Sequence, residues 1–472
     1  MYTLIDAVGN AEEEARGAAL EDRMRYAKFM QCAERFAVDN GLIASGPHAT
    51  RLLLGSEKEP LPVALDSFQY EFYSGRAVPH ARALGDALYA ADPQGLGHYT
   101  TVKTKIEDYR FVVEVDGRDL VTITALPVYR GVRTADVLVP LRRPAQFAVG
   151  PNGPPLALPC AGPDIQLLAV YSALCNPAEA GKWGALLGTE ADLRRLFGPA
   201  MRTKIDRLPA SGGAEDEPPN EPGKRLRQAL FTHYVPGPGR VLIGPLAVAL
   251  LTGAREPGRA GGDASRPQVV SVGSVEADTR EIAALGERVK VEVQWDVHDP
   301  KIPGDMRMRR LTVYAVVAGR REPVMNVYNS AEHELIPFLR VKNKHVSHDK
   351  KDAHYKIGTP FVLLRFRLVD MWIIQVLLRM GKLQQPYAKS MLRSMLADYE
   401  TVAAHYEKLL TSGVPDLPAR LMPTEDYIGR LEDLELAMKR KAEANTRFFP
   451  PYMPAARREP TDHTTIEQSR TG

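Results

Sequence analysis

Cysteine is scarce in this sequence: the 472 residues contain only Cys32, Cys160 and Cys175. These three lie far apart and match neither a disulfide framework nor the paired spacing of a zinc site, which predicts a protein of a reducing compartment. Walker and GxGxxG phosphate loops are absent, and no histidine pairs with a serine or cysteine in a recognisable motif. These absences leave P-loop, dinucleotide-binding and histidine-activated nucleophilic sites without support.

Long apolar runs are lacking as well. The most apolar stretch, FVLLRFRLVDMWIIQVLLRMGK at 361–382, includes Arg365, Arg367, Asp370 and Arg379. It therefore fails as a membrane span, and we interpret it as a buried helix with a narrow polar edge. The opening residues, MYTLIDAVGNAEEE, are acidic and have no apolar core, so we expect neither a signal peptide nor a membrane partner.

Charge of one sign is not in excess, because the formal net charge is only +3. Any nucleic-acid binding must then come from local patches. What the sequence does contain is a globular composition, 44% hydrophobic and 25% charged, over a length that predicts two or three domains. The stretch LPASGGAEDEPPNEPGK at 208–224 is rich in Pro, Gly and acids and indicates a linker between them.

The most informative segment is DSFQYEFYSGRAVPHARALGDAL at 66–88. It predicts a short aromatic strand that carries one acid, Glu71, followed by a turn and an amphipathic helix. Upstream, GLIASGPHATRLLLG at 41–55 predicts a strand, a Ser-Gly-Pro turn and a helix. Downstream, residues 100–127 alternate with period two and predict a hairpin around Asp116-Gly117. The first part of the chain is therefore a mixed α/β unit.

An internal repeat is one interpretation of two further segments. LIASGPHATRLLLG at 42–55 and VLIGPLAVALLTG at 241–253 share a strand, a Gly-Pro turn and a helix start. Gly-Pro turns also recur by chance, so the sequence alone leaves duplication and coincidence both open.

Several separated stretches together resemble one family. They are the strand–turn–helix at 42–55, YEFYS at 70–74 with ALGDAL after it, VDGRDLVTITALP at 115–127, VYSALCNPAEAGKWGALL at 170–187, VYNSAEHELIPF at 327–338 and KIGTPFVLLRFRLVDMW at 356–372. In this order they are similar to the poly(A) polymerase catalytic subunits of large nucleocytoplasmic DNA viruses. The resemblance runs from about residue 25 to 400.

The resemblance implies an α/β (α+β) fold with four parts. We expect a nucleotidyltransferase-like mixed-sheet domain with a helical extension at 1–206, a linker at 207–224, a second α/β domain at 225–410, and a C-terminal helix with a flexible tail at 411–472. The implied activity is template-independent transfer of AMP from ATP to RNA 3′ ends in mRNA polyadenylation, with Mg²⁺ or Mn²⁺ and ATP. A homodimer or a processivity partner, and a location in the viral factory of the host cytoplasm or in the virion, are implied in the same way.

The metal-binding positions depart from the family pattern. Two Mg²⁺ ions need hard anionic oxygens, and the family supplies Asp-x-Asp before Phe-Tyr-Ser with a third acid on a neighbouring strand. The matching residues here are Gln69, Glu71 and Thr122. Only Glu71 keeps a charge, because Gln69 offers a neutral oxygen and Thr122 a hydroxyl. We therefore expect weakened metal binding.

This departure leaves alternatives to a working polymerase. One is a catalytically impaired nucleotidyltransferase-fold protein that acts as an RNA-binding or partner subunit, and another is a transferase with a different substrate. Asp66 or Glu114 could replace a missing carboxylate in a shifted register. The competing interpretations are that Asp66 is an acid of the turn before the strand and that Glu114 is an exposed acid of the hairpin.

Nucleotide and RNA contacts are also implied. In the family, the Ser45-Gly46 turn brings backbone N–H groups to the triphosphate, although Pro47 lacks such a donor, and Lys182 could reach a phosphate. The segment LRVKNKHVSHDKKDAHYK at 339–356 carries six Lys/Arg against two Asp, which favours RNA contact over a plain solvated loop only if it borders a cleft. Its candidate RNA-binding residues are Lys342, Lys344, Lys350 and Lys351.

Overall fold

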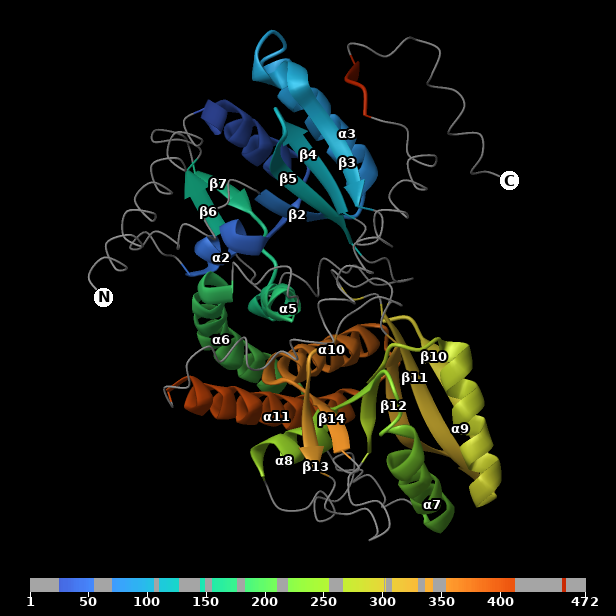
Figure 1. Cartoon of the computed structure of the whole chain (residues 1–472). Helices are drawn as coiled ribbons and strands as arrows, with labels where there is room; N and C mark the ends of the chain where they lie inside the picture. Colours follow the sequence, from blue (N-terminus) through green and yellow to red (C-terminus); the bar gives the residue numbers. More distant parts are fainter. Residues whose placement is uncertain are drawn as a thin grey trace, which may run out of the picture. The chain divides into compact units, whose positions relative to one another are not determined.

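The chain forms two compact units, shown in the computed structural model of Figure 1. The first combines Met1–Val128, Arg133–Gly162 and Ala437–Gly472, and the second combines Tyr129–Val132 and Pro163–Leu436. The structure describes residues 25–54, 70–105, 110–126, 145–148, 155–175, 183–209, 220–253, 266–300, 302, 308–329, 336–342, 354–411 and 452–455. Each unit contains a mixed sheet with helices, so the α/β class expected from the sequence is confirmed.

The first unit has a five-stranded sheet in the order β1-β2-β5-β4-β3. Strands β2 and β5 are parallel, and the other neighbours are antiparallel. After a helix over 25–39, its elements are β1 (Ile43–Ser45), α2 (Gly46–Leu54), β2 (Tyr70–Ser74), α3 (Ala77–Ala91), β3 (Thr100–Lys105), β4 (Arg110–Val115) and β5 (Arg118–Ala125). A separate hairpin joins β6 (Ala145–Ala148) to β7 (Pro155–Leu158).

The core of the first unit lies on one face of this sheet. Helix α3 buries Ala77, Ala81, Leu84 and Leu88, a spacing of three and four residues that forms one apolar stripe. This helix packs on β3, β4 and β5, where the core-facing side chains include Phe72, Val113 and Ile123. Because side chains alternate along a strand, Glu71 and Thr122 project from the opposite face.

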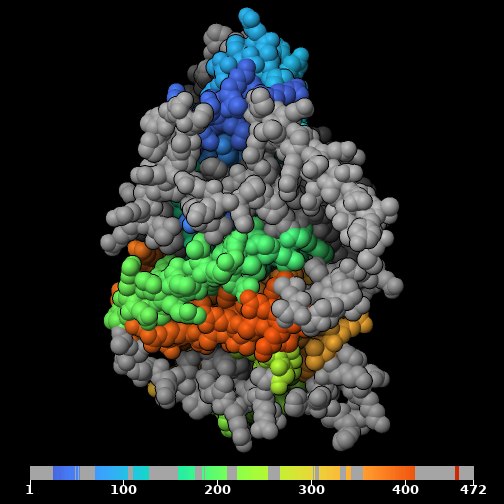
Figure 2. Space-filling view, turned by 90° about the vertical axis from the view of Figure 1, so that its left-hand side faces the viewer, coloured from blue at the N-terminus to red at the C-terminus, as the bar shows by residue number. Residues whose placement is uncertain are grey.

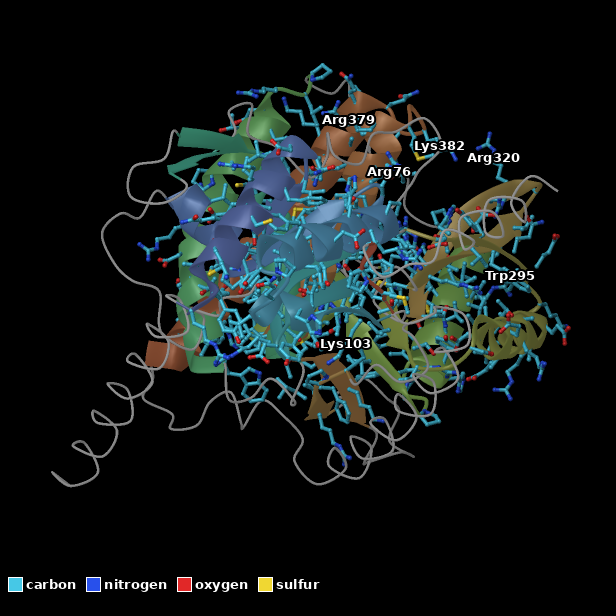
Figure 3. All side chains as sticks on the ribbon, turned by 90° about the horizontal axis from the view of Figure 1, so that it is seen from above. Arg76, Lys103, Trp295, Arg320, Arg379 and Lys382 are labelled. Atoms are coloured by element: carbon cyan, nitrogen blue, oxygen red, sulfur yellow. The ribbon has the colours of Figure 1, made fainter. Side chains whose placement is uncertain are left out.

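The second unit has a seven-stranded sheet in the order β10-β11-β12-β9-β8-β14-β13. Its strands are β8 (Arg240–Ile243), β9 (Gln268–Ser271), β10 (Glu292–His298), β11 (Arg309–Val317), β12 (Arg320–Asn329), β13 (Phe338–Lys342) and β14 (His354–Gly358). Its helices are α5 (Pro163–Leu174), α6 (Trp183–Asp206), α7 (Glu221–Ala229), α8 (Gly244–Thr252), α9 (Val275–Val289), α10 (Pro360–Arg379) and α11 (Gln385–Thr411). The edge strand β10 projects Trp295 outward with 39% of its surface exposed (Figure 3).

Helices α5 and α6 were expected to extend the first domain but belong to the second unit. Tyr171 of α5 is hydrogen-bonded to Glu190 of α6 at 2.6 Å and to Tyr399 of α11 at 2.7 Å. Figure 2 shows α6 and α11 side by side, and Phe197 packs edge-on against Tyr399. The main passage from the first unit to the second therefore falls between residues 162 and 163. Helix α7 begins at Glu221, inside the segment expected to be the linker.

Helix α10 confirms the buried helix expected at 361–382. Nearly its whole length is buried, including Arg367 and Asp370. These two side chains form an ion pair of 3.1 Å, which is how the helix carries charges in an apolar interior. Among the described residues, no helix is long and apolar enough to cross a membrane.

The two units repeat one topology. In the first, β1-α2-β2-α3-β3-β4-β5 gives the sheet order β1-β2-β5-β4-β3, and in the second β8-α8-β9-α9-β10-β11-β12 gives β8-β9-β12-β11-β10. Both copies have one parallel pair, β2 with β5 and β9 with β12, among antiparallel neighbours. The repeat that the two Gly-Pro segments suggested is therefore present in the fold.

Candidate functional site

The candidate site is a row of three residues across neighbouring strands. Ser45 at the end of β1 lies opposite Glu71 on β2, and Glu71 lies opposite Thr122 on β5. Directly opposed residues in a sheet point to the same face, with strands about 4.8 Å apart. The fold thus brings together Ser45, Glu71 and Thr122, which the sequence had placed in one site.

The carboxylate of Glu71 lies against the turn that opens α2. Gly46 has φ +67°, and a Cβ built there would be 2.7 Å from Glu71 Cδ and 2.9 Å from its Oε2. Glycine suits the positive φ, and any larger residue would also force the end of the Glu71 side chain to shift. A helix N-terminus favours an anion, and here that position is taken by the protein's own acid.

A second row on the same face contains residues that sequence reasoning missed. Tyr73 of β2 lies opposite Thr124 of β5, which lies opposite Arg110 of β4. Burial raises the pKa of Tyr73 to about 12, with Arg110 lowering and Glu71 raising it, so the phenol stays neutral near pH 7. The alternation of β2 and β4 was the available signal for placing Tyr73 and Arg110 beside Glu71.

Glu114 does not replace a missing carboxylate. It is buried on β4, where Lys103 Nζ lies 2.5 Å away and Thr101 donates a hydrogen bond of 3.1 Å. Figure 3 shows Lys103 on β3. Burial acts to raise the pKa of Glu114, but hydrogen bonds from Lys103 and other neighbours outweigh it, and its pKa falls. Glu114 is thus an ionised partner of Lys103.

The remaining candidates lie partly or wholly outside the described residues. Gln69, Asp66, Lys182, Lys344, Lys350 and Lys351 fall there, and for Lys342, at the end of β13, only the backbone is described. Within the described ranges, no group of three or more His, Cys, Asp or Glu residues could hold a metal ion. The donors in the described row, one carboxylate beside two hydroxyls, do not by themselves fit a pair of Mg²⁺ ions.

At the other end of β2, a pocket of about 340 Å³ opens beside Ser74 and His80. Ser74 Oγ is 2.8 Å from His80 Nδ1 and accepts a 2.9 Å hydrogen bond from the backbone N–H of Arg76. Burial, with Arg76 contributing, lowers the pKa of His80. The sequence had indicated no Ser–His pair. Since Ser74 also holds the turn before α3, its contacts serve that turn.

In the second unit, side chains of the protein itself occupy the equivalent row. Gly244 has φ +80°, and a Cβ there would be 2.6 Å from Gln268 Oε1. Gln268 lies opposite Asn326, as Glu71 lies opposite Thr122. Arg367 of α10 donates a hydrogen bond to Gln268 Oε1 and pairs with Asp370 and Asp398. A buried guanidinium therefore occupies this second site.

The known proteins that this chain resembles are viral. No family model matches the chain. The chain is 27% identical over 459 residues to an uncharacterized protein of African swine fever virus from a South African isolate, covering 96% of this chain and 98% of that protein. Isolates from Namibia and Malawi give the same identity over 459 and 457 residues.

Among solved structures, the crystal structure of the Megavirus polyadenylate synthase matches with a TM-score of 0.53 at 14% identity. The match covers 86% of this chain and 74% of that one. At this identity the likeness shows the fold alone. The chain thus has an α/β fold similar to that of the Megavirus polyadenylate synthase.

Proposed function

We propose that this protein is a nucleotidyltransferase-fold subunit that has lost two-metal nucleotidyl transfer and binds RNA or supports an active partner. The observation that carries the proposal is the Glu71 carboxylate packed against Gly46, with the uncharged Thr122 beside it. The likeness to the Megavirus polyadenylate synthase supports the fold on which the proposal rests.

The first argument is charge. Two-metal transfer brings two divalent ions within about 4 Å of each other, and bridging carboxylates offset their repulsion. The described row offers one acid and two neutral hydroxyls, from Ser45 and Thr122. A neutral hydroxyl is a weak ligand for Mg²⁺, which prefers anionic oxygens in octahedral geometry. Metal and metal-bound ATP should therefore bind weakly.

The second argument is space. In the family that the sequence resembles, the turn before this helix receives the nucleotide triphosphate. Here Glu71 lies so close to the turn that a single methyl group on Gly46 would collide with it. An incoming phosphate would have to displace a group of its own sign. The arrangement thus favours a closed turn over a nucleotide-binding one.

A working adenylyltransferase is the second candidate, favoured by the structural likeness. It would take Mg²⁺ or Mn²⁺ with ATP and act on an RNA 3′ end, with the homodimer or processivity partner that the family resemblance implies. It requires further acids, such as Asp66, to approach Glu71 when substrate binds.

The test is a primer-extension assay with RNA affinity measured on the same preparation. The purified chain, a labelled RNA primer and ATP are combined with Mg²⁺ or Mn²⁺. We expect measurable RNA binding with little or no extension, unchanged in Glu71→Ala and in the control Glu287→Ala, an exposed acid on α9. Robust extension that disappears only in Glu71→Ala would reject the proposal in favour of the enzyme.

A further inference from the structure

The C-terminal segment 452–455 packs against α3, although the sequence predicted a flexible tail there. Both segments belong to the first unit. The Tyr452 hydroxyl donates a hydrogen bond of 2.8 Å to Asp86 Oδ1, and the backbone N–H of Ala455 donates one of 2.9 Å to the same oxygen. Pro454 between them is buried, whereas Met453 is 53% exposed. One carboxylate thus holds two donors of a short segment.

Gly85, next to Asp86, makes room for the tyrosine ring. A Cβ at this position would be 2.8 Å from Tyr452 Cζ and 3.0 Å from Val102 Cγ2 of β3. Glycine is a poor residue for a helix interior, and Gly85 lies in the middle of α3 with a helical backbone. Its presence is explained by the close approach of Tyr452 on one side and of the sheet on the other.

We propose that the Gly85–Asp86 face of α3 is a peptide-docking site that recognises a tyrosine followed two residues later by proline. Its occupant is the chain's own C-terminal segment. The recognition elements are the ring against Gly85, the hydroxyl and a backbone N–H on Asp86, and the buried Pro454. Because the chain passes through the second unit before residue 437, docking holds its end on the first unit.

Hydrogen exchange of the full chain tests the site. In the parent, the Ala455 amide should exchange at least tenfold slower than in Gly85→Ala and Asp86→Ala. The α3 amides are followed in the same experiment, because the new methyl group in Gly85→Ala also approaches Val102. Alanine favours a helix, and we expect α3 to stay protected, which separates release of the tail from unfolding. The control Asp39→Ala, an exposed acid of the first unit, should leave the tail protected. Equal exchange at Ala455 in all four proteins would overturn the proposal.

A synthetic peptide identifies the occupant. The peptide PPYMPAAR, residues 450–457, should bind a full chain whose own segment is disabled by Tyr452→Ala and Pro454→Ala. It should not bind when Gly85→Ala is added. If protection of Ala455 in the parent rises with protein concentration, the occupant is the tail of a second copy, and docking within one chain is wrong.

Discussion

Replacing Gly46 by alanine tests the contact between Glu71 and the turn. The change has two costs. Alanine at φ +67° is strained by roughly 1–2 kcal/mol, and its Cβ, 2.7 Å from Glu71 Cδ, forces the end of that side chain out of its rotamer, which adds about 0.5–1.5 kcal/mol. We expect Gly46→Ala to destabilise the first unit by about 1.5–3.5 kcal/mol in all.

A matched variant separates the two costs. Gly41 has φ +59° but nothing within 4 Å of its Cβ position, so Gly41→Ala should show the strain alone. In a Glu71→Ala background, the cost of Gly46→Ala should fall to that of Gly41→Ala. The difference is the coupling energy of the pair, expected at about 0.5–1.5 kcal/mol.

Native-state hydrogen exchange of β2 and β5 amides in rising urea is the assay, because a chain of two units need not unfold in one step. Equal costs for Gly46→Ala with and without Glu71 would show that the carboxylate is not held against the turn. The closed-turn reasoning would then fail.

Three further outcomes are expected. The double variant Lys350→Ala, Lys351→Ala should flatten the slope of log RNA affinity against log salt concentration by roughly 0.7 per lost phosphate contact. Identical slopes for parent and variant would remove the 339–356 segment from the RNA interface. Arg367→Ala should destabilise the second unit by about 3–5 kcal/mol in urea unfolding, since Asp370 and Asp398 lose their buried cation; a change below about 1 kcal/mol would contradict that ion network. Because burial lowers the pKa of His80 from 6.5, the unfolded chain binds a proton there that the folded chain does not. The contribution of neutral His80 to stability is full above about pH 6.5 and is lost as the pH falls toward the lower pKa of the folded state. His80→Gln should therefore flatten the fall of stability between pH 7 and 5. An unchanged pH profile of stability would contradict this role of His80.

Local patterns were enough to predict much of the first unit. The strand, turn and helix at 41–55 appear as β1 and α2, and the aromatic strand and helix at 66–88 appear as β2 and α3. The hairpin around Asp116-Gly117 joins β4 to β5, with both turn residues at positive φ. These features depend on neighbouring residues, on strand periodicity and on turn chemistry.

Contacts between distant residues could not be predicted in this way. The sequence placed Glu71 and Gly46 in one site but gave no sign that the carboxylate closes the turn, because this depends on the register of β1 against β2. The place of α5 and α6 in the second unit depends on long-range contacts such as the hydrogen bond between Tyr171 and Tyr399, which lie 228 residues apart in the sequence. Likewise, nothing local in Tyr452 indicates that Asp86 binds it.

Calorimetric titration of ATP with Mn²⁺ is the most direct test of whether two-metal chemistry has been lost. The parent should bind the metal–nucleotide complex only weakly, because Glu71 alone supplies charge to the row that it shares with Thr122. Adding Gln69→Asp, Glu71→Asp and Thr122→Asp together should strengthen binding. The contrary result is tight binding by the parent with two Mn²⁺ ions per chain, abolished by Glu71→Ala.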